Sequence, residues 1–177
     1  MLYLPFERDW KMSFQIMIDL PKCTGCGICE LACSLYHEKE CNPEKSRCRV
    51  IRYEHEGILY SIPIMCQQCE ESPCQIVCPT KAIHRNQITN VVTVDERRCI
   101  GCKYCFTVCP FGCITIDQKM GKAVKCNTCE GEPKCVELCP SGALSFVKYD
   151  KVSMTKKRSI FDKYIENLKK LSTSMIE

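Results

Sequence analysis

Sixteen of the nineteen cysteines in this chain of 177 residues fall into four copies of one spaced pattern. Thiolates two residues apart in a tight loop converge on a metal centre, whereas a disulfide framework needs no such repeated register. The repeat therefore predicts four sulfur-ligated sites. The copies are Cys23, Cys26, Cys29 and Cys33; Cys66, Cys69, Cys74 and Cys78; Cys99, Cys102, Cys105 and Cys109; and Cys126, Cys129, Cys135 and Cys139.

The spacing of these cysteines indicates the cofactor. Thiolate is the soft, anionic ligand that iron–sulfur clusters require, and the compact first and third copies have the spacing of bacterial [4Fe-4S] ferredoxins. We therefore expect four [4Fe-4S] clusters. Zinc is the alternative, because Cys-x2-Cys pairs also build zinc ribbons, although zinc needs no third and fourth cysteine at these spacings.

The copies alternate between a compact form and a longer form with proline in its gap, which predicts two nested modules. The second and third copies would form the inner module, and the first and fourth the outer one. In two-cluster ferredoxins the fourth cysteine of a motif binds the other cluster of the pair. The expected ligand sets are Cys66, Cys69 and Cys74 with Cys109; Cys99, Cys102 and Cys105 with Cys78; Cys23, Cys26 and Cys29 with Cys139; and Cys126, Cys129 and Cys135 with Cys33.

Short β signals separate the motifs, and proline after the fourth cysteine ends a short helix in three of them. Ser34 stands in place of this proline in the first motif, so its helix is expected to continue through His37. The predicted fold class is α+β, with two nested ferredoxin-like modules, short helices and small antiparallel sheets. The strands are expected at 14–19, 49–53, 58–64, 91–95, 114–117, 123–125 and 144–147.

We expect five segments along the chain: an N-terminal extension with the first strand (1–22), the first part of the outer module with a hairpin (23–65), the inner module (66–117), the second part of the outer module (118–147) and a C-terminal tail (148–177). Ser159 and Asp162 predict a helix start in the tail, and an apolar stripe runs from Ile160 to Leu171. This amphipathic helix would pack on its own domain or dock on a partner subunit. The role of Trp10 is equally open.

Composition limits the partners and the compartment. The formal charge of +4 treats every cysteine as neutral, and four oxidised clusters would bring it to about −4. Basicity is thus no argument for nucleic-acid binding. With neither a signal-peptide pattern nor an apolar run long enough to span a membrane, a cytoplasmic protein without membrane insertion is expected. Without its cysteines, the chain has few apolar residues for a core of its length, so the clusters would serve as core.

Three cysteines lie outside the repeat. Cys113 occupies the position that Ala82 and Ala143 have in the sister motifs, which predicts a small buried residue. Cys41 and Cys48, with His37 and His55 nearby, are interpreted as free thiols or as a zinc site.

No dinucleotide, phosphate-loop or nucleophile motif accompanies the cysteines. All four motifs are complete, and a cluster with a full set of protein ligands mainly exchanges electrons. The sequence therefore favours electron transfer over catalysis, and no catalytic residue is expected.

Residues 19–147 resemble the four-cluster electron-transfer subunits of molybdenum and tungsten oxidoreductases and of some hydrogenases. The sixteen cysteines, the stretch from Cys99 to Cys105 and the Cys-Pro segments carry this resemblance. The run CTGCGICELACSLYHE, Cys23 to Glu38, is similar to small subunits associated with tungsten aldehyde oxidoreductases and class II benzoyl-CoA reductases.

This resemblance implies a larger catalytic subunit with a tungsten– or molybdenum–pterin site, a further redox protein, and no catalysis by the chain alone. A subunit of a formate dehydrogenase, hydrogenase or dimethyl sulfoxide reductase type complex, or a free-standing polyferredoxin carrier, is the alternative.

Overall fold

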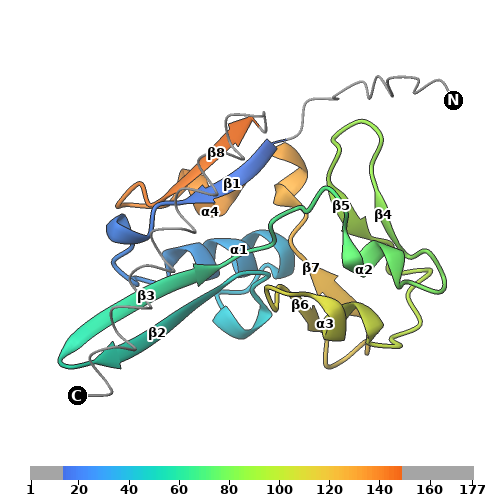
Figure 1. Cartoon of the computed structure of the whole chain (residues 1–177), viewed down its shortest axis with the longest axis horizontal. Helices are drawn as coiled ribbons and strands as arrows, with labels where there is room; N and C mark the ends of the chain where they lie inside the picture. Colours follow the sequence, from blue (N-terminus) through green and yellow to red (C-terminus); the bar gives the residue numbers. More distant parts are fainter. Residues whose placement is uncertain (1–13, 149–177) are drawn as a thin grey trace, which may run out of the picture. The chain divides into compact units, whose positions relative to one another are not determined.

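The computed structural model describes residues 14–148 (Figure 1). By its contacts the chain divides into two compact units, residues 1–147 and 148–177. Trp10 and the expected C-terminal helix lie outside the described residues.

The first unit is an α+β structure of short elements. The strands are β1 (Phe14–Ile18), β2 (Arg49–His55), β3 (Ile58–Ile64), β4 (Ile83–Arg85), β5 (Val92–Val94), β6 (Ile114–Ile116), β7 (Ala123–Lys125) and β8 (Leu144–Lys148). The helices are α1 (Ile28–Glu38), α2 (Pro73–Ile76), α3 (Tyr104–Val108) and α4 (Lys134–Glu137). Single 3-10 turns are η1 (Leu20–Lys22), η2 (Pro43–Lys45) and η3 (Thr128–Gly131).

Within the described residues, the strands form two-stranded sheets only. β1 pairs with β8, β2 with β3, β4 with β5 and β6 with β7, and the last three pairs are antiparallel. The expected strands are confirmed, whereas β4 was not predicted. The predicted extension of the first helix is also confirmed, since α1 continues to Glu38.

Two hydrophobic cores organise these elements. In the first, α1 packs against α4 near the paired strands β1 and β8. In the second, α2 packs against α3 beside β4 to β7. Cysteines belong to both. The first core contains Ile16, Cys29, Cys33, Cys48, Val50, Met65, Cys135 and Leu144, and the second contains Cys74, Ile83, Val92, Cys105, Ile114 and Ala123.

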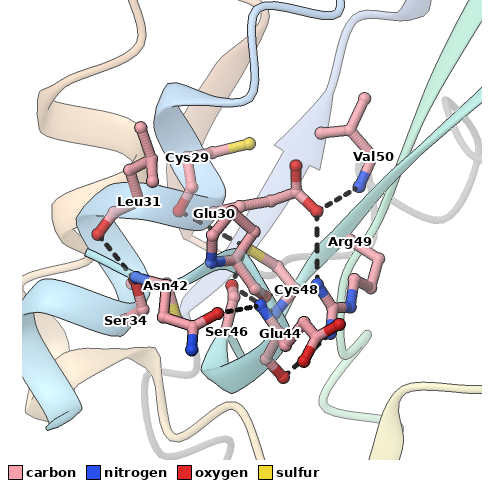
Figure 2. A network of polar contacts seen from close by, with 12 residues as sticks. Cys29, Glu30, Leu31, Ser34, Asn42, Glu44, Ser46, Cys48, Arg49 and Val50 are labelled. Carbon is pink, nitrogen blue, oxygen red and sulfur yellow. Dashed lines mark hydrogen bonds and ion pairs between the residues drawn. The ribbon is translucent and has the colours of Figure 1, made fainter. Parts of the chain in front are cut away.

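The β2–β3 hairpin is anchored at its base and bare along its length. Glu30 of α1 accepts a hydrogen bond of 3.2 Å from the Val50 N–H and lies 3.8 Å from the Arg49 guanidinium (Figure 2). Further out, large apolar side chains are exposed on both strands, including Tyr53 (60%) and Leu59 (61%). The hairpin therefore extends from the first core with little apolar cover from described residues.

A close approach between two loops gives a testable requirement for glycine. Gly101 and Gly142 both have positive φ, +71° and +62°. A Cβ on Gly101 would lie 2.3 Å from the carbonyl oxygen of Gly121, whereas a Cβ on Gly142 would meet nothing within 4 Å.

We expect Gly142→Ala to lower the free energy of unfolding by about 1 kcal/mol through backbone strain alone. Gly101→Ala should cost about 2 kcal/mol more, because the backbone must also move. Anaerobic chemical denaturation followed by circular dichroism measures both variants. Equal losses would show that the contact with Gly121 is unimportant.

Candidate iron–sulfur sites

All four cysteine loops share one backbone feature. The residue before the second cysteine has positive φ in every motif: Gly25 (70°), Gln68 (48°), Gly101 (71°) and Thr128 (56°). A left-handed residue within a loop turns successive N–H groups towards one side, which creates a concave site for an anion. The four loops therefore share the same backbone conformation at this position, although only two of them have glycine there.

The first of two cavities is lined by one of the expected ligand sets. It contains about 360 Å³ of empty space, part of it open to solvent, and is bordered by Cys66, Cys69, Cys74 and Cys109, with Cys113 and Lys125 also in its wall. Cys109 comes from the third motif, whereas the other three ligands come from the second. The fold therefore brings the expected distant cysteine to this loop.

The second cavity repeats this arrangement in the other core. It contains about 320 Å³ of empty space, part of it open to solvent, and is bordered by Cys23, Cys26, Cys29 and Cys139. Here the fourth cysteine comes from more than a hundred residues along the chain. The pairing of β1 with β8 and the packing of α1 on α4 hold the two segments together.

Contacts link the remaining expected sets. The charge of Cys33 acts on the thiols of Cys126, Cys129 and Cys135, whose pKa values are raised first by burial and then by neighbouring thiolates. Cys78 and Cys99 pack against the buried residues of the second core, which include Cys105. Burial raises the pKa of Cys105, and the charges of Cys99 and Cys102 add to this.

Backbone N–H groups donate to several ligand sulfurs. The donors are Arg47 N to Cys33 Sγ (3.3 Å), Cys113 N to Cys109 Sγ (3.4 Å), Thr128 N to Cys126 Sγ (3.4 Å) and Ala123 N to Cys99 Sγ (3.5 Å). Such hydrogen bonds stabilise the thiolate form that binds iron and raise the reduction potential of a cluster.

Arginine side chains fasten two of the loops. The Arg52 guanidinium donates to the Gly25 carbonyl from Nε (2.9 Å) and Nη2 (2.6 Å). Arg85 donates to the carbonyls of Cys69 and Glu70 and to Ser72 Oγ, which spans the longer gap of the second motif. Both arginines combine positional control with positive charge beside an expected anionic centre.

Arg47 and His37 lie near the Cys33 and Cys129 sulfurs. The Arg47 Nε is buried and has no hydrogen-bond partner among the described residues. The Cys48 thiol lowers the pKa of Cys33 most, and the Arg47 N–H and charge lower it further. His37 Nε2 lies 3.7 Å from Cys129 Sγ. Burial, with help from Arg47 and Lys39, lowers the pKa of His37 to about 4, so the ring is neutral at pH 7.

The three cysteines outside the repeat have separate environments. Cys48 is buried, and its thiol lies 3.5 Å from the Cys29 carbonyl oxygen (Figure 2). Hydrogen bonding to Cys29 and Cys33 raises the pKa of Cys48 and lowers that of its two partners. Cys113 is buried as predicted, while Cys41 is exposed.

Residues 14–148 contain no group of three His, Cys, Asp or Glu side chains arranged to hold a single metal ion. The cysteines instead border spaces that are partly open to solvent, with N–H donors and cations beside them. Four soft anionic sulfurs around such a space suit a polynuclear iron–sulfur group. The orphan donor of Arg47 fits the same interpretation, because cluster sulfur accepts hydrogen bonds.

Comparison with known proteins identifies the family. Residues 58–149 match the model of the 4Fe-4S dicluster domain. The chain belongs to this family. [4Fe-4S] clusters are therefore the cofactors of this protein, and electron transfer is its role.

Two curated relatives match most of this chain. The polyferredoxin-like subunit of the aliphatic sulfonate oxidoreductase of Pyrococcus furiosus is 42% identical over 75% of this sequence and 72% of the relative. One chain of the anaerobic dimethyl sulfoxide reductase of Escherichia coli is 38% identical over 79% and 76%. Among solved structures, the active-site complex BamBC of benzoyl coenzyme A reductase, as isolated, matches with 27% identity, 89% coverage of both proteins and a TM-score of 0.47.

Several residues of the sites could not be found from cysteine spacing. Lys125, Arg47, Arg85 and Gln68 act through contacts between distant segments. Of these, Lys125 could have been identified from the alternation of residues along a strand. It stands two residues after Ala123 on β7, and alternate residues of a strand share a face, so a lysine at this position points inward with a core alanine.

The environments of Cys41, Cys48 and Cys113 predict a labelling pattern. The thiolate is the reactive form of cysteine, so burial and a raised pKa both slow alkylation. We expect iodoacetamide to modify Cys41 in the native cluster-loaded protein, while Cys48 and Cys113 react only after unfolding. Peptide mass spectrometry measures the three sites, with the urea-unfolded protein as control. Rapid native labelling of Cys48 would contradict its placement.

Proposed function

We propose that this chain carries four [4Fe-4S] clusters and relays single electrons between a larger catalytic subunit and a further redox protein. The arrangement of the two cavities supports this most directly, because each is lined by three cysteines of one motif and the fourth cysteine of its nested partner. Complete cysteine ligation leaves the irons without an open position, so the chain would not be catalytic by itself.

We further propose that the ligand sets are those expected from the sequence. The outer module would combine residues 23–65 and 118–147, and the inner module would be residues 66–117. Two separate cores, one in each proposed half, support this division. β7 pairs with β6 and Ala123 packs in the second core, which adds residues 123–125 to the inner half.

The proposed order in which electrons pass through the clusters follows from which cysteine ligand sets lie next to each other. The sites of the first and fourth motifs share one core, those of the second and third share the other, and the Cys66 charge acts on Cys126 across the boundary. Cys26 and Cys102 are the two exposed ligands, and they belong to the first and third motifs. Electrons would therefore enter and leave through these two sites.

The two curated relatives are each named as one component of an oxidoreductase, which supports a complex with a catalytic partner. The resemblance of residues 23–38 favours a tungsten–pterin partner of the aldehyde oxidoreductase or benzoyl-CoA reductase type. A reducing, cytoplasmic setting is proposed with it, because thiols stay available for iron there. Among the described residues, no helix has the length and apolar character needed to cross a membrane.

Anaerobic affinity purification from the native host tests this function. The tagged chain should carry about 16 irons, four for each cubane, and should copurify with a larger subunit that contains tungsten or molybdenum by metal analysis. A chain recovered alone with all its iron would instead be a free-standing carrier. Half the iron would refute the four-cluster proposal.

Cross-ligation has its own test, based on matched cysteine variants. Cys109→Ala and Cys69→Ala should each disturb the cluster of the second motif, whereas Cys102→Ala disturbs that of the third. The electron paramagnetic resonance (EPR) difference spectrum of reduced Cys109→Ala should therefore match that of Cys69→Ala. A match with Cys102→Ala would show that each motif binds its own cluster.

A further inference from the structure

Lys125 is a buried cation at the boundary between the two cores. It is only 4% exposed, although lysine is almost never buried without a compensating group. None of the carboxylates that the structure describes forms an ion pair with it. Its Nζ donates to the carbonyl oxygens of Val92 and Cys126.

The position of Lys125 is fixed from both sides. Val92 lies on β5 in the inner core, and Cys126 is the first cysteine of the fourth motif. Gln68 reinforces the same link, because its Nε2 donates to the Cys126 carbonyl (2.9 Å) and its Oε1 accepts from the Val92 N–H (2.8 Å). The lysine is therefore part of a polar bridge between the second and fourth cysteine loops.

Cysteines of both loops lie beside this cation. Lys125 lines the cavity of Cys66, Cys69, Cys74 and Cys109. Burial raises the pKa of the Cys69, Cys74 and Cys126 thiols, and the Lys125 charge acts in the opposite direction on all three. As cluster ligands, the Cys69, Cys74 and Cys126 sulfurs would thus supply the negative charge that no described carboxylate supplies.

We propose that Lys125 is the fixed positive charge that raises the reduction potentials of the two central clusters, the one of Cys66, Cys69, Cys74 and Cys109 and the one of Cys126, Cys129, Cys135 and Cys33. This inference rests on the proposed cluster ligands. Reduction adds one negative charge to a cluster, and a nearby cation in a poorly solvated interior stabilises that charge. Without the Lys125 charge, the two central clusters would be harder to reduce, and electron transfer from one module to the other would be less favourable at this step.

The test is a potentiometric titration of the full chain followed by EPR. Lys125→Met should lower the midpoint potentials of two clusters, with a change of about tenfold in the equilibrium constant for reduction, equal to 59 mV for one electron. The other two midpoints should move less. Lys125→Arg, which keeps the charge, should restore values close to those of the unaltered protein.

Lys119→Met is the matched control. It removes the same charge from an exposed position near the β6–β7 turn, where solvent screens it. We expect the four midpoints to stay unchanged. An equal shift in Lys119→Met and Lys125→Met, or no shift in Lys125→Met, would overturn the proposal.

Gln68→Glu keeps the test decisive if Lys125→Met does not retain its clusters. This nearly isosteric change adds a negative charge beside the same Cys126 carbonyl, so the same two midpoints should fall. Unchanged midpoints in Gln68→Glu would then refute the proposal. A failure of the proposed function would appear earlier, as an unaltered chain without four reducible clusters.

Discussion

The structure depends on bringing many thiolates into the interior of a chain with little apolar core. Both cores contain cysteines as principal members, and the described strands are only three to seven residues long. Buried anions are stable only when donors, cations or metals compensate them. The iron–sulfur centres therefore act as structural elements as well as cofactors, and metal binding and folding should be one process.

Compensation is supplied locally, by residues that differ from site to site. Arg52 and Arg85 hold loop carbonyls, Arg47 lies beside Cys33, and Lys125 lies between two sites. The formal charge of +4 is thus best understood as an average over cations gathered around sulfur. An argument from net charge alone would have suggested an acidic partner where the positive charge has an internal role.

Local sequence signals were enough to predict the fold class, most strands and the long first helix: β-type runs lie between the cysteine motifs, and Ser34 replaces the proline that ends the other helices. The nested pairing was predicted from the alternation of compact and long motifs, and it stays a proposal that the residues lining two cavities support. The strand β4, the bridge from Gln68 to Cys126 and the clamp formed by Arg85 could not be predicted. The bridge and the clamp depend on contacts over 13 to 58 residues of sequence, and β4 has a single apolar residue, Ile83, to mark it as a strand.

The β2–β3 hairpin has a consequence for handling the protein. Neither outer edge of this two-stranded sheet pairs with another described strand, and Ile51, Tyr53, Ile58, Leu59 and Tyr60 are exposed along it. Bare strand edges with apolar side chains invite pairing between molecules. A preparation of this chain without its partner subunits would therefore tend to self-associate at high concentration. Oligomers in such a sample would reflect contacts of the β2–β3 hairpin more than the physiological assembly.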